Sequence, residues 1–357
     1  MHKRVAFLVL LVAGGLAPRA LAQPPKLEVQ EVSVTGCMPK GATLSPDGRR
    51  FYVTNFGQEN VRNITIYDTA TLALVGTIDV PGIVVESVLS PDGATIYASN
   101  FGRDSVQYID VATRRVTREV KVGPHPKVLV LSRDGAALFA ANWNGSSVTQ
   151  IDVREAKVVR TLAAGPHPRG MAVSDKGTLY VANFDGASID IYPGVIAKPE
   201  NTPFAAADHR RIAACRIPRH LALSRDESAL YISCFHDSAV HVLDLATLEI
   251  THRVLIGSSP KSIDVTRDGR FIFSADYGKE SNSVSVIDTS DWSARVFQVP
   301  GMDRGSGIAV MPDGVHALVT GWYDNHIYLV GFEGTGGHPD TALNTIQSWI
   351  RRRHHDG

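Results

Sequence analysis

The chain has 357 residues, of which 44% are hydrophobic and 20% charged, and 36 basic side chains balance 36 acidic ones. This composition is typical of a soluble globular protein and excludes a disordered chain. Without an excess of positive charge, the protein does not bind nucleic acid over its whole surface, so any such role would need a local basic patch.

The first 22 residues have the features of a secretory signal peptide. Lys3 and Arg4 form a positive start, Val5–Ala17 is an apolar run, and Ala20–Ala22 fits a small-residue cleavage site. The run is too short to serve as a transmembrane segment. We therefore expect cleavage before Gln23 and a periplasmic or secreted protein. The removed segment carries three basic and no acidic residues, which leaves a net charge of −3.

One pattern recurs seven times in the remaining chain: an apolar strand, a turn rich in Ser, Asp and Gly, and a second strand that begins near an aromatic residue. The turn aspartates are Asp47, Asp92, Asp134, Asp175, Asp226, Asp268 and Asp313. They are 45, 42, 41, 51, 42 and 45 residues apart. Such a period, with several short strands in each unit, is typical of β-propeller blades. The aspartates themselves are expected to serve the turns.

We therefore predict an all-β fold, a seven-bladed β-propeller of four-stranded blades over residues 23–335. The strands of the third repeat are expected at Lys127–Ser132, Ala137–Ala141, Val148–Val153 and Lys157–Leu162. The seventh repeat ends after His326–Phe332 without a fourth strand, whereas Leu27–Val34 is a strand without a repeat. Pairing these two would close the ring and leave no long free edge.

Two segments lie outside the regular repeats. The longest step contains Pro193–Arg211, which we expect to form a rim loop in the outer part of the fourth blade. Residues 336–357 form a C-terminal tail in which Pro339–Arg353 has apolar residues at helical spacing, so we predict a short helix packed on the ring.

The segments YVTN (Tyr52–Asn55) and YVAN (Tyr180–Asn183), with strand endings such as VSVID, resemble the YVTN-repeat β-propeller family of bacteria and archaea. The resemblance covers residues 27–332. It implies the fold but no single function, because similar propellers occur in secreted binding proteins, surface-layer proteins, lactonases and redox-protein subunits. The last three repeats depart from the motif and have YISC, FSAD and LVTG.

Overlaying the repeats places a set of basic residues at the mouth of the central channel. They share one position, where the inner strands begin: Lys40, Lys127, Arg169, Arg219 and Lys261. Val85 and Ser306 take this position in the second and seventh repeats. Positive charge clustered in a cleft attracts anions. The same pattern would arise if Pro-Lys and Pro-Arg pairs only began the strands and their charges were solvated.

A second set on the same face is aromatic and follows the second strand of every repeat: Phe56, Phe101, Trp143, Phe184, Phe235, Tyr277 and Trp322. These rings would either fill the gaps between blades or offer faces for a stacked ligand, with Trp143 and Trp322 as candidate contacts. Aromatic faces beside a basic patch suit single-stranded nucleic acid, a sugar polymer or an anionic aromatic ligand. The resemblance adds weight to single-stranded DNA, which members of the family are reported to bind.

The mouth loops also contain a candidate metal set, formed by Cys37, Met38, His125 and His167. Sulfur and imidazole ligands suit copper, although His in a GPHP turn also serves as an ordinary polar loop residue. We predict no other cofactor. Cys215 and Cys234 flank one predicted hairpin and are the candidate disulfide, which leaves Cys37 as the odd cysteine.

Motifs of catalysis are missing: there is no nucleophile elbow, HExxH or phosphate-binding glycine loop. We expect a monomeric, non-catalytic binding or scaffold module for an anionic ligand or a partner protein. One alternative is a lactone hydrolase with channel residues drawn from Glu86, Asp264, Asn55, Asn100, Asn142 and Asn183. Another is an accessory propeller of a periplasmic redox or metal system. His220 and Glu86 are a further candidate acid–base pair in the channel.

Overall fold

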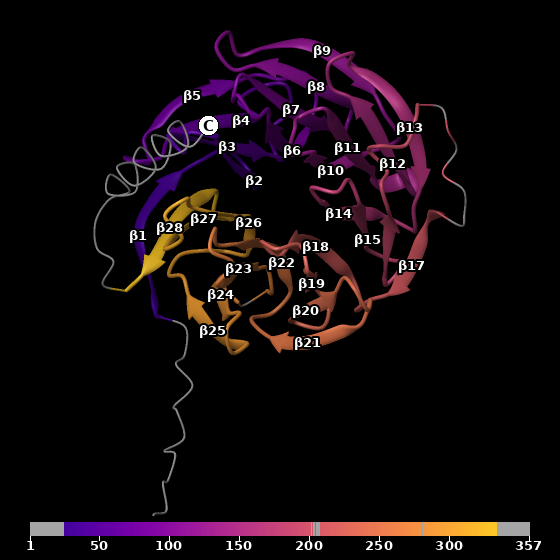
Figure 1. Cartoon of the computed structure of the whole chain (residues 1–357). Helices are drawn as coiled ribbons and strands as arrows, with labels where there is room; N and C mark the ends of the chain where they lie inside the picture. Colours follow the sequence, from indigo (N-terminus) through magenta and orange to yellow (C-terminus); the bar gives the residue numbers. More distant parts are fainter. Residues whose placement is uncertain (1–24, 201, 203, 205–207, 280, 334–357) are drawn as a thin grey trace, which may run out of the picture.

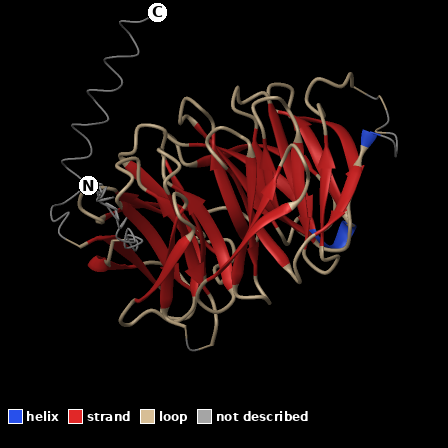
Figure 2. Ribbon diagram, turned by 60° about the horizontal axis from the view of Figure 1, so that its bottom comes forward, coloured by secondary structure: helices blue, strands red, loops and turns tan. Residues whose placement is uncertain are grey.

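Short strands joined by tight turns fill the part of the chain that the computed structural model describes, residues 25–200, 202, 204, 208–279 and 281–333. They form seven four-stranded antiparallel sheets arranged around one axis (Figures 1 and 2). The predicted signal peptide and the predicted helix within Pro339–Arg353 lie outside the described residues. The described part holds no helix that is long and apolar enough to cross a bilayer.

Each blade runs from an inner strand at the axis to an outer strand at the rim. The strands of blades 1 to 3 are β2 (Pro39–Leu44), β3 (Arg50–Asn55), β4 (Ile64–Asp68), β5 (Leu74–Ile78), β6 (Val84–Leu89), β7 (Thr95–Asn100), β8 (Ser105–Asp110), β9 (Arg115–Lys121), β10 (Pro126–Leu131), β11 (Ala137–Asn142), β12 (Ser147–Asp152) and β13 (Lys157–Ala163). The strands of blades 4 and 5 are β14 (Pro168–Val173), β15 (Leu179–Asn183), β16 (Ser188–Tyr192), β17 (Arg210–Ala213), β18 (Pro218–Leu223), β19 (Ala229–Cys234), β20 (Ala239–Asp244) and β21 (Ile250–Leu255). Those of blades 6 and 7 are β22 (Pro260–Val265), β23 (Phe271–Asp276), β24 (Ser283–Asp288), β25 (Ser293–Gln298), β26 (Gly305–Val310), β27 (His316–Gly321), β28 (His326–Phe332) and β1 (Leu27–Val34). A 3-10 turn, η1 (Trp143–Gly145), follows β11.

The predicted closure of the ring is confirmed. β1 pairs antiparallel with β28, from Leu27 opposite Phe332 to Val34 opposite His326. The first strand of the described chain is thus the outer strand of the last blade (Figure 1). Closure by a strand from the other end of the sequence removes the free edge that an open ring would have.

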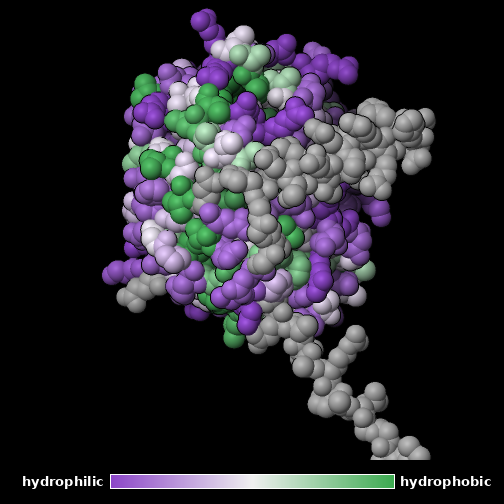
Figure 3. All heavy atoms as spheres, turned by 90° about the vertical axis from the view of Figure 1, so that its left-hand side faces the viewer, coloured by the Kyte–Doolittle hydropathy of each residue, from purple (hydrophilic) through white to green (hydrophobic). Residues whose placement is uncertain are grey.

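Apolar side chains lie between the blades, because both faces of each middle strand are covered by neighbouring blades. All six residues of β11 are buried, and one cluster joins Ile64 and Ile66 of blade 1 to Ile96 of blade 2. The outer strands are more exposed. On the rim, Val34 of β1 and Leu74 of β5 are 64% and 46% exposed, and Figure 3 shows apolar and hydrophilic residues interspersed on this side.

The predicted rim loop lies between β16 and β17 of blade 4. Arg160 of β13 attaches it to blade 3 by donating hydrogen bonds to the backbone carbonyls of Lys198, Pro199 and Thr202. On the face that carries the Ser-Asp-Gly turns, six of the seven turn aspartates serve the turns as expected: the carboxylate of Asp47, for example, accepts hydrogen bonds from the side chain of Ser45 and from the backbone of Arg49. Asp175 differs, because its carboxylate pairs with Arg133.

Candidate functional site

All seven inner strands contain one extra residue near their beginning. In blade 1, Pro39 lies opposite Asn55 and Ala42 opposite Val53, so three steps on β2 match two on β3. The other six blades have the same kind of register shift. Such a bulge changes the direction of the side chains within it. In five blades it contains the basic residue that the repeat alignment singled out.

These five side chains, Lys40, Lys127, Arg169, Arg219 and Lys261, are called the cationic cluster below. The strands that carry them surround the axis (Figure 1), and their face of the ring is called the mouth face. Lys40, Arg169 and Lys261 are 6%, 7% and 4% exposed, and the other two are half-buried. The alternative that these charges are merely solvated is therefore wrong for the three buried ones.

The cationic cluster has little negative charge around it. None of its members forms an ion pair with a carboxylate of the described residues, whereas peripheral cations of the mouth face such as Arg103 and Arg216 do. Two buried polar atoms at the shared position, Nε of Arg219 and Oγ of Ser306, have no hydrogen-bond partner among the described residues. Unpaired buried charge is costly, so its retention calls for an explanation beyond folding.

Aromatic rings support the cluster from the mouth face. Nζ of Lys127 lies 3.3 Å from the ring centroid of Trp143 and 5.7 Å from that of Phe101. Nζ of Lys261 lies 3.8 Å from Trp322 and 4.0 Å from Tyr277. Lys40 contacts the ring of Phe56, Arg169 that of Trp143, and Arg219 those of Phe184, Phe235 and Tyr277. Cation–π attraction offsets part of the desolvation cost.

The rings themselves are mostly half-buried and contact one another. Trp143 packs edge-on to Phe184 and stacks on the imidazole of His167, and Trp322 is only 8% exposed. The aromatic set therefore packs between the blades, which agrees with the interpretation from sequence that these rings fill the gaps there. Trp322 offers little free face to a ligand, whereas Trp143 keeps a partly exposed ring.

Burial and mutual repulsion depress the pKa values of the cluster. Desolvation is the larger cause for Lys40, Lys127 and Lys261, and the charges of Arg169 and Arg219 add to it. The pKa of Lys127 falls to about 7, and those of Lys40 and Lys261 fall well below the usual lysine value. The five side chains start from inner strands that surround the axis, and the charge of Arg169 in blade 4 lowers the pKa of Lys40 in blade 1 across the ring.

Blade 2 contributes an acid to this centre. Glu86 follows Val85, which takes the shared position, and its charge raises the pKa of Lys40 and Lys261. A Cβ atom on Gly41 of the neighbouring blade would lie 2.3 Å from Oε2 of Glu86, so the carboxylate would have to shift if that residue carried a side chain. The five cations and Glu86 together leave a formal charge of +4 when all are ionised.

His220 extends the site along the axis. Burial, together with Arg169 and Arg219, lowers its pKa to about 4, so its imidazole is neutral at pH 7. His220 also lines a cavity of about 390 Å³ that reaches toward the turn face, where Asp264 lies on the opposite wall strand, β22. The carboxylate of Asp264 accepts hydrogen bonds from the backbone of Val265 and Val310, and burial raises its pKa.

The two candidate histidine ligands contact other side chains, and the candidate cysteine is free. Nδ1 of His125 contacts the amide of Asn144, that of His167 contacts Asp185, and Cys37 is an exposed free thiol. In the described part of the chain, the His, Cys, Asp and Glu ligand atoms that gather within 4.8 Å are those of Cys215, Cys234 and His241. The predicted set with Met38 is thus not assembled as a cluster, and a metal at the mouth stays a prediction.

The asparagines proposed for a lactonase are fully buried and structural, so that assignment is wrong. Each ends a second strand and bonds to a partner on the third, as Asn142 does to Thr149 and Asn183 to Asp190, both at 2.9 Å. A glycine in the preceding loop fits against each: a Cβ on Gly123 would lie 2.6 Å from Asn142. We call this arrangement the latch. Asn55 and Asn100 form the latches of blades 1 and 2.

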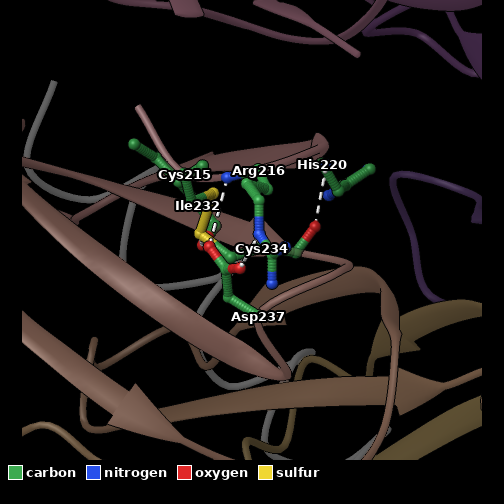
Figure 4. The surroundings of a disulfide bond; sticks show 7 residues. Cys215, Arg216, His220, Ile232, Cys234 and Asp237 are labelled. Carbon is green, nitrogen blue, oxygen red and sulfur yellow. Dashed lines mark hydrogen bonds and ion pairs between the residues drawn. A yellow bond between two sulfur atoms is a disulfide. The ribbon is translucent and has the colours of Figure 1, made fainter. Parts of the chain in front are cut away.

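Blade 5 replaces the polar latch by a covalent one. Cys215 stands at the glycine position and Cys234 at the asparagine position, and a disulfide joins them (Figure 4). His241 lies on the third strand of blade 5, at the position from which Thr149 and Asp190 bond to the asparagines of blades 3 and 4. Arg216, directly after Cys215, forms an ion pair with Asp237. The disulfide therefore fixes the loop that leads to Arg219 of the cationic cluster.

Blade 6 has an aspartate, Asp276, in its latch, and burial raises the pKa of this carboxyl to about 7 although Ser274, Ser283 and Ser285 donate to it. The raised pKa means that the folded state holds the proton more tightly than the unfolded state. The stabilising effect of this proton is complete below about pH 4, near the ordinary pKa of aspartate, and is lost progressively as the pH rises from there through 7. We expect Asp276→Asn, which restores the residue of blades 1 to 4, to stabilise the protein relative to wild type by about 2–4 kcal/mol above pH 7. Urea unfolding of both proteins at about pH 4 and about pH 8 checks this, and an equal difference at both pH values would contradict it.

Sequence alignment of the repeats found the cationic cluster and its aromatic neighbours but missed two features. The first is the bulge that turns the basic side chains toward the axis, which leaves no mark in residue type. The second is the latch. The sequence does contain a signal of the latch, because Gly123 and Asn142 stand at the same positions of their repeat as Cys215 and Cys234 do of theirs. The disulfide was predicted only from the place of the two cysteines beside one hairpin.

Residues 59–334 match the model of the YNCE-like β-propeller family, which is more than half of the chain. Among curated proteins, 6-phosphogluconolactonases of Yersinia pestis (strain Pestoides F) and Yersinia pseudotuberculosis (serotype O:1b, strain IP 31758) are each 36% identical over 72 residues. That stretch is 19% of this chain and only 22% of the length of those relatives. Among solved structures, a chain of Kuenenia stuttgartiensis hydrazine synthase matches with a TM-score of 0.71 and 18% identity, over 86% of this chain and 99% of that one. This likeness concerns the fold alone.

Proposed function

Because the chain belongs to the YNCE-like β-propeller family, whose description names a fold and no reaction, we propose that it is an exported binding module that holds an anionic ligand at the centre of its ring. The observation that carries the proposal is the cationic cluster: five basic side chains from five blades, three of them at most 7% exposed, with no ion pair to a described carboxylate. A bound anion supplies the missing partner. Charge-assisted hydrogen bonds are the strongest that such a ligand could form.

The neutral His220 and the carboxylate of Glu86 add selectivity at this centre. Glu86 only accepts hydrogen bonds when ionised, so it disfavours a ligand that is anionic on every side. It favours one that places a hydroxyl or amino group toward blade 2. The disulfide of blade 5 holds the loop before Arg219 and supports a site that is preformed rather than assembled on binding.

Reversal of two charges tests the proposal. The double substitution Lys127→Glu and Arg169→Glu should weaken sulfate binding by about 100-fold or more, because each lost charged hydrogen bond is worth about 1.5–3 kcal/mol. It should also flatten the salt dependence. Isothermal titration of the mature protein measures both, and cooperative unfolding of the variant shows that it is folded. Sulfate affinity unchanged by the double substitution would refute the proposal.

A lactone hydrolase is the second candidate, favoured by the partial match to 6-phosphogluconolactonases. In this candidate Glu86 and the neutral His220 would act on a lactone bound beside the cationic cluster. Hydrolysis of a sugar lactone by the purified protein, abolished by Glu86→Gln, would be its signature. No turnover across a panel of lactones would remove it, and the binding function would stand.

A further inference from the structure

The burial and convergence of the cationic cluster restrict the size of its ligand, an argument that rests on the proposed function. Lys40, Arg169 and Lys261 are 6%, 7% and 4% exposed. A polymer that lies across a protein surface is held by exposed charges along a track. Side chains this deeply buried at one point of the ring cannot follow such a track, and only a ligand that enters the centre can reach them.

Several exposed cations of the mouth face have an acidic partner. Arg103 and Lys121 share Glu119 at 3.3 Å, Arg216 pairs with Asp237 at 3.0 Å, and Arg304 lies 3.9 Å from Asp303. Arg62 and Lys279 are exposed and form no ion pair with a described residue. The exposed charge is therefore scattered over separate loops, whereas the buried unpaired charge belongs to the cationic cluster.

The donors at the centre come from several directions. Lys40 belongs to blade 1, Lys261 to blade 6, and Arg169 and Arg219 to blades 4 and 5 on the other side of the axis. The unpartnered Nε of Arg219 and Oγ of Ser306 add two more polar atoms. A compact oxyanion has acceptor oxygens on all sides and can contact such donors at once. A nucleotide phosphate within a strand has two of its oxygens tied up in the backbone.

The charge of the centre favours a multivalent ligand. The cavity of about 390 Å³ that His220 lines lies on the turn side, and no member of the cationic cluster is among its lining residues, so it does not set the size of the ligand. When all five cations are protonated, Glu86 reduces the formal charge of the centre to +4, which matches a ligand with two or more negative charges better than a single anion.

We infer that the ligand is a compact multivalent oxyanion of the phosphate-ester or polycarboxylate class, bound at the ring axis between blades 1, 4, 5 and 6, and that single-stranded nucleic acid is not the ligand. Aromatic residues of the mouth face hold the lysine and arginine side chains rather than stack bases. Trp322 at 8% exposure has little ring face to offer a base.

The test compares pyrophosphate, citrate and two lengths of oligothymidylate as probes of the mature protein by isothermal titration. We expect pyrophosphate or citrate to bind with one site per chain. Binding should weaken about tenfold or more in the double variant Lys40→Met/Lys261→Met. A matched control, Lys121→Met/Lys157→Met, removes two exposed and paired lysines of outer strands and should bind as wild type does. Thermal unfolding shows whether each variant is folded.

The two sources within this class are separated by competition: a site for phosphate esters prefers pyrophosphate, and a site for polycarboxylates prefers citrate. Tighter binding of the longer oligothymidylate, without displacement by either small anion, would overturn this inference and leave an anion-binding function in place. If neither the small anions nor the oligothymidylates bind, the proposed function itself fails.

Discussion

Replacing Lys261 by methionine should raise the stability of the ligand-free protein while it weakens anion binding. Lys261 is 4% exposed, and its ammonium group pairs with no described carboxylate. Replacement of a poorly paired buried charge by an apolar side chain of similar length is often stabilising by about 1–4 kcal/mol. Methionine keeps the unbranched shape and can contact the rings of Tyr277 and Trp322 through its sulfur.

The gain is reduced by two lost cation–π contacts, at 3.8 and 4.0 Å, each worth about 1 kcal/mol. We therefore expect a net gain of at most about 2 kcal/mol for Lys261→Met, seen as a higher urea midpoint with an unchanged slope. The matched control is Lys121→Met on the exposed end of β9, which should change stability by less than about 0.5 kcal/mol. A clear loss of stability in Lys261→Met would mean that the ammonium group is needed for folding rather than for a ligand.

Sulfate affinity should fall as the pH rises through 7. The pKa of Lys127 is lowered to about 7, by burial first and then by Arg169 and Arg219, against a smaller opposite effect of Asp185. A bound anion favours the protonated lysine, so binding takes up a proton near neutral pH and weakens once Lys127 is neutral. The loss of one charged hydrogen bond corresponds to about a tenfold or larger loss of affinity.

Sulfate is the suitable probe because its own charge is constant over this pH range. Titration calorimetry in two buffers of different ionisation enthalpy gives both the affinity and the proton uptake. In Lys127→Arg the guanidinium stays charged near neutral pH, so the decrease should become smaller, and what remains comes from Lys40 and Lys261, whose pKa values are also lowered. A pH profile that is the same in wild type and Lys127→Arg would exclude Lys127 as its origin.

The fold followed from sequence because each repeat carries its own signals. The turn aspartates gave the number of blades, and the unmatched strand Leu27–Val34 gave the closure. Position in the repeat also located the cationic cluster. The effect of these charges on one another could not be predicted from the repeats, because Arg169 and Lys40 are far apart in sequence and only the closed ring brings their charges together.

Residue type misled where one position serves two roles. Asn55, Asn100, Asn142 and Asn183 are polar and lie near the mouth, which made them candidates for catalysis, yet they are fully buried in latches. Side chains alternate along a strand, so a shift of one residue decides between the axis and the interior of a blade. The bulges at the start of the inner strands add such a shift, and residue type does not reveal it.

The central claim, that the cationic cluster exists to hold an anion, is tested most directly by the thermal midpoint with and without pyrophosphate. Wild type should be stabilised, by about 2.7 kcal/mol when the ligand is at 100 times its dissociation constant. Lys40→Met/Lys261→Met should be more stable than wild type without ligand, and at the same ligand concentration an affinity at least tenfold weaker limits its stabilisation to at most about 1.4 kcal/mol. A wild-type midpoint that no small oxyanion shifts, together with a double variant less stable than wild type, would contradict the claim.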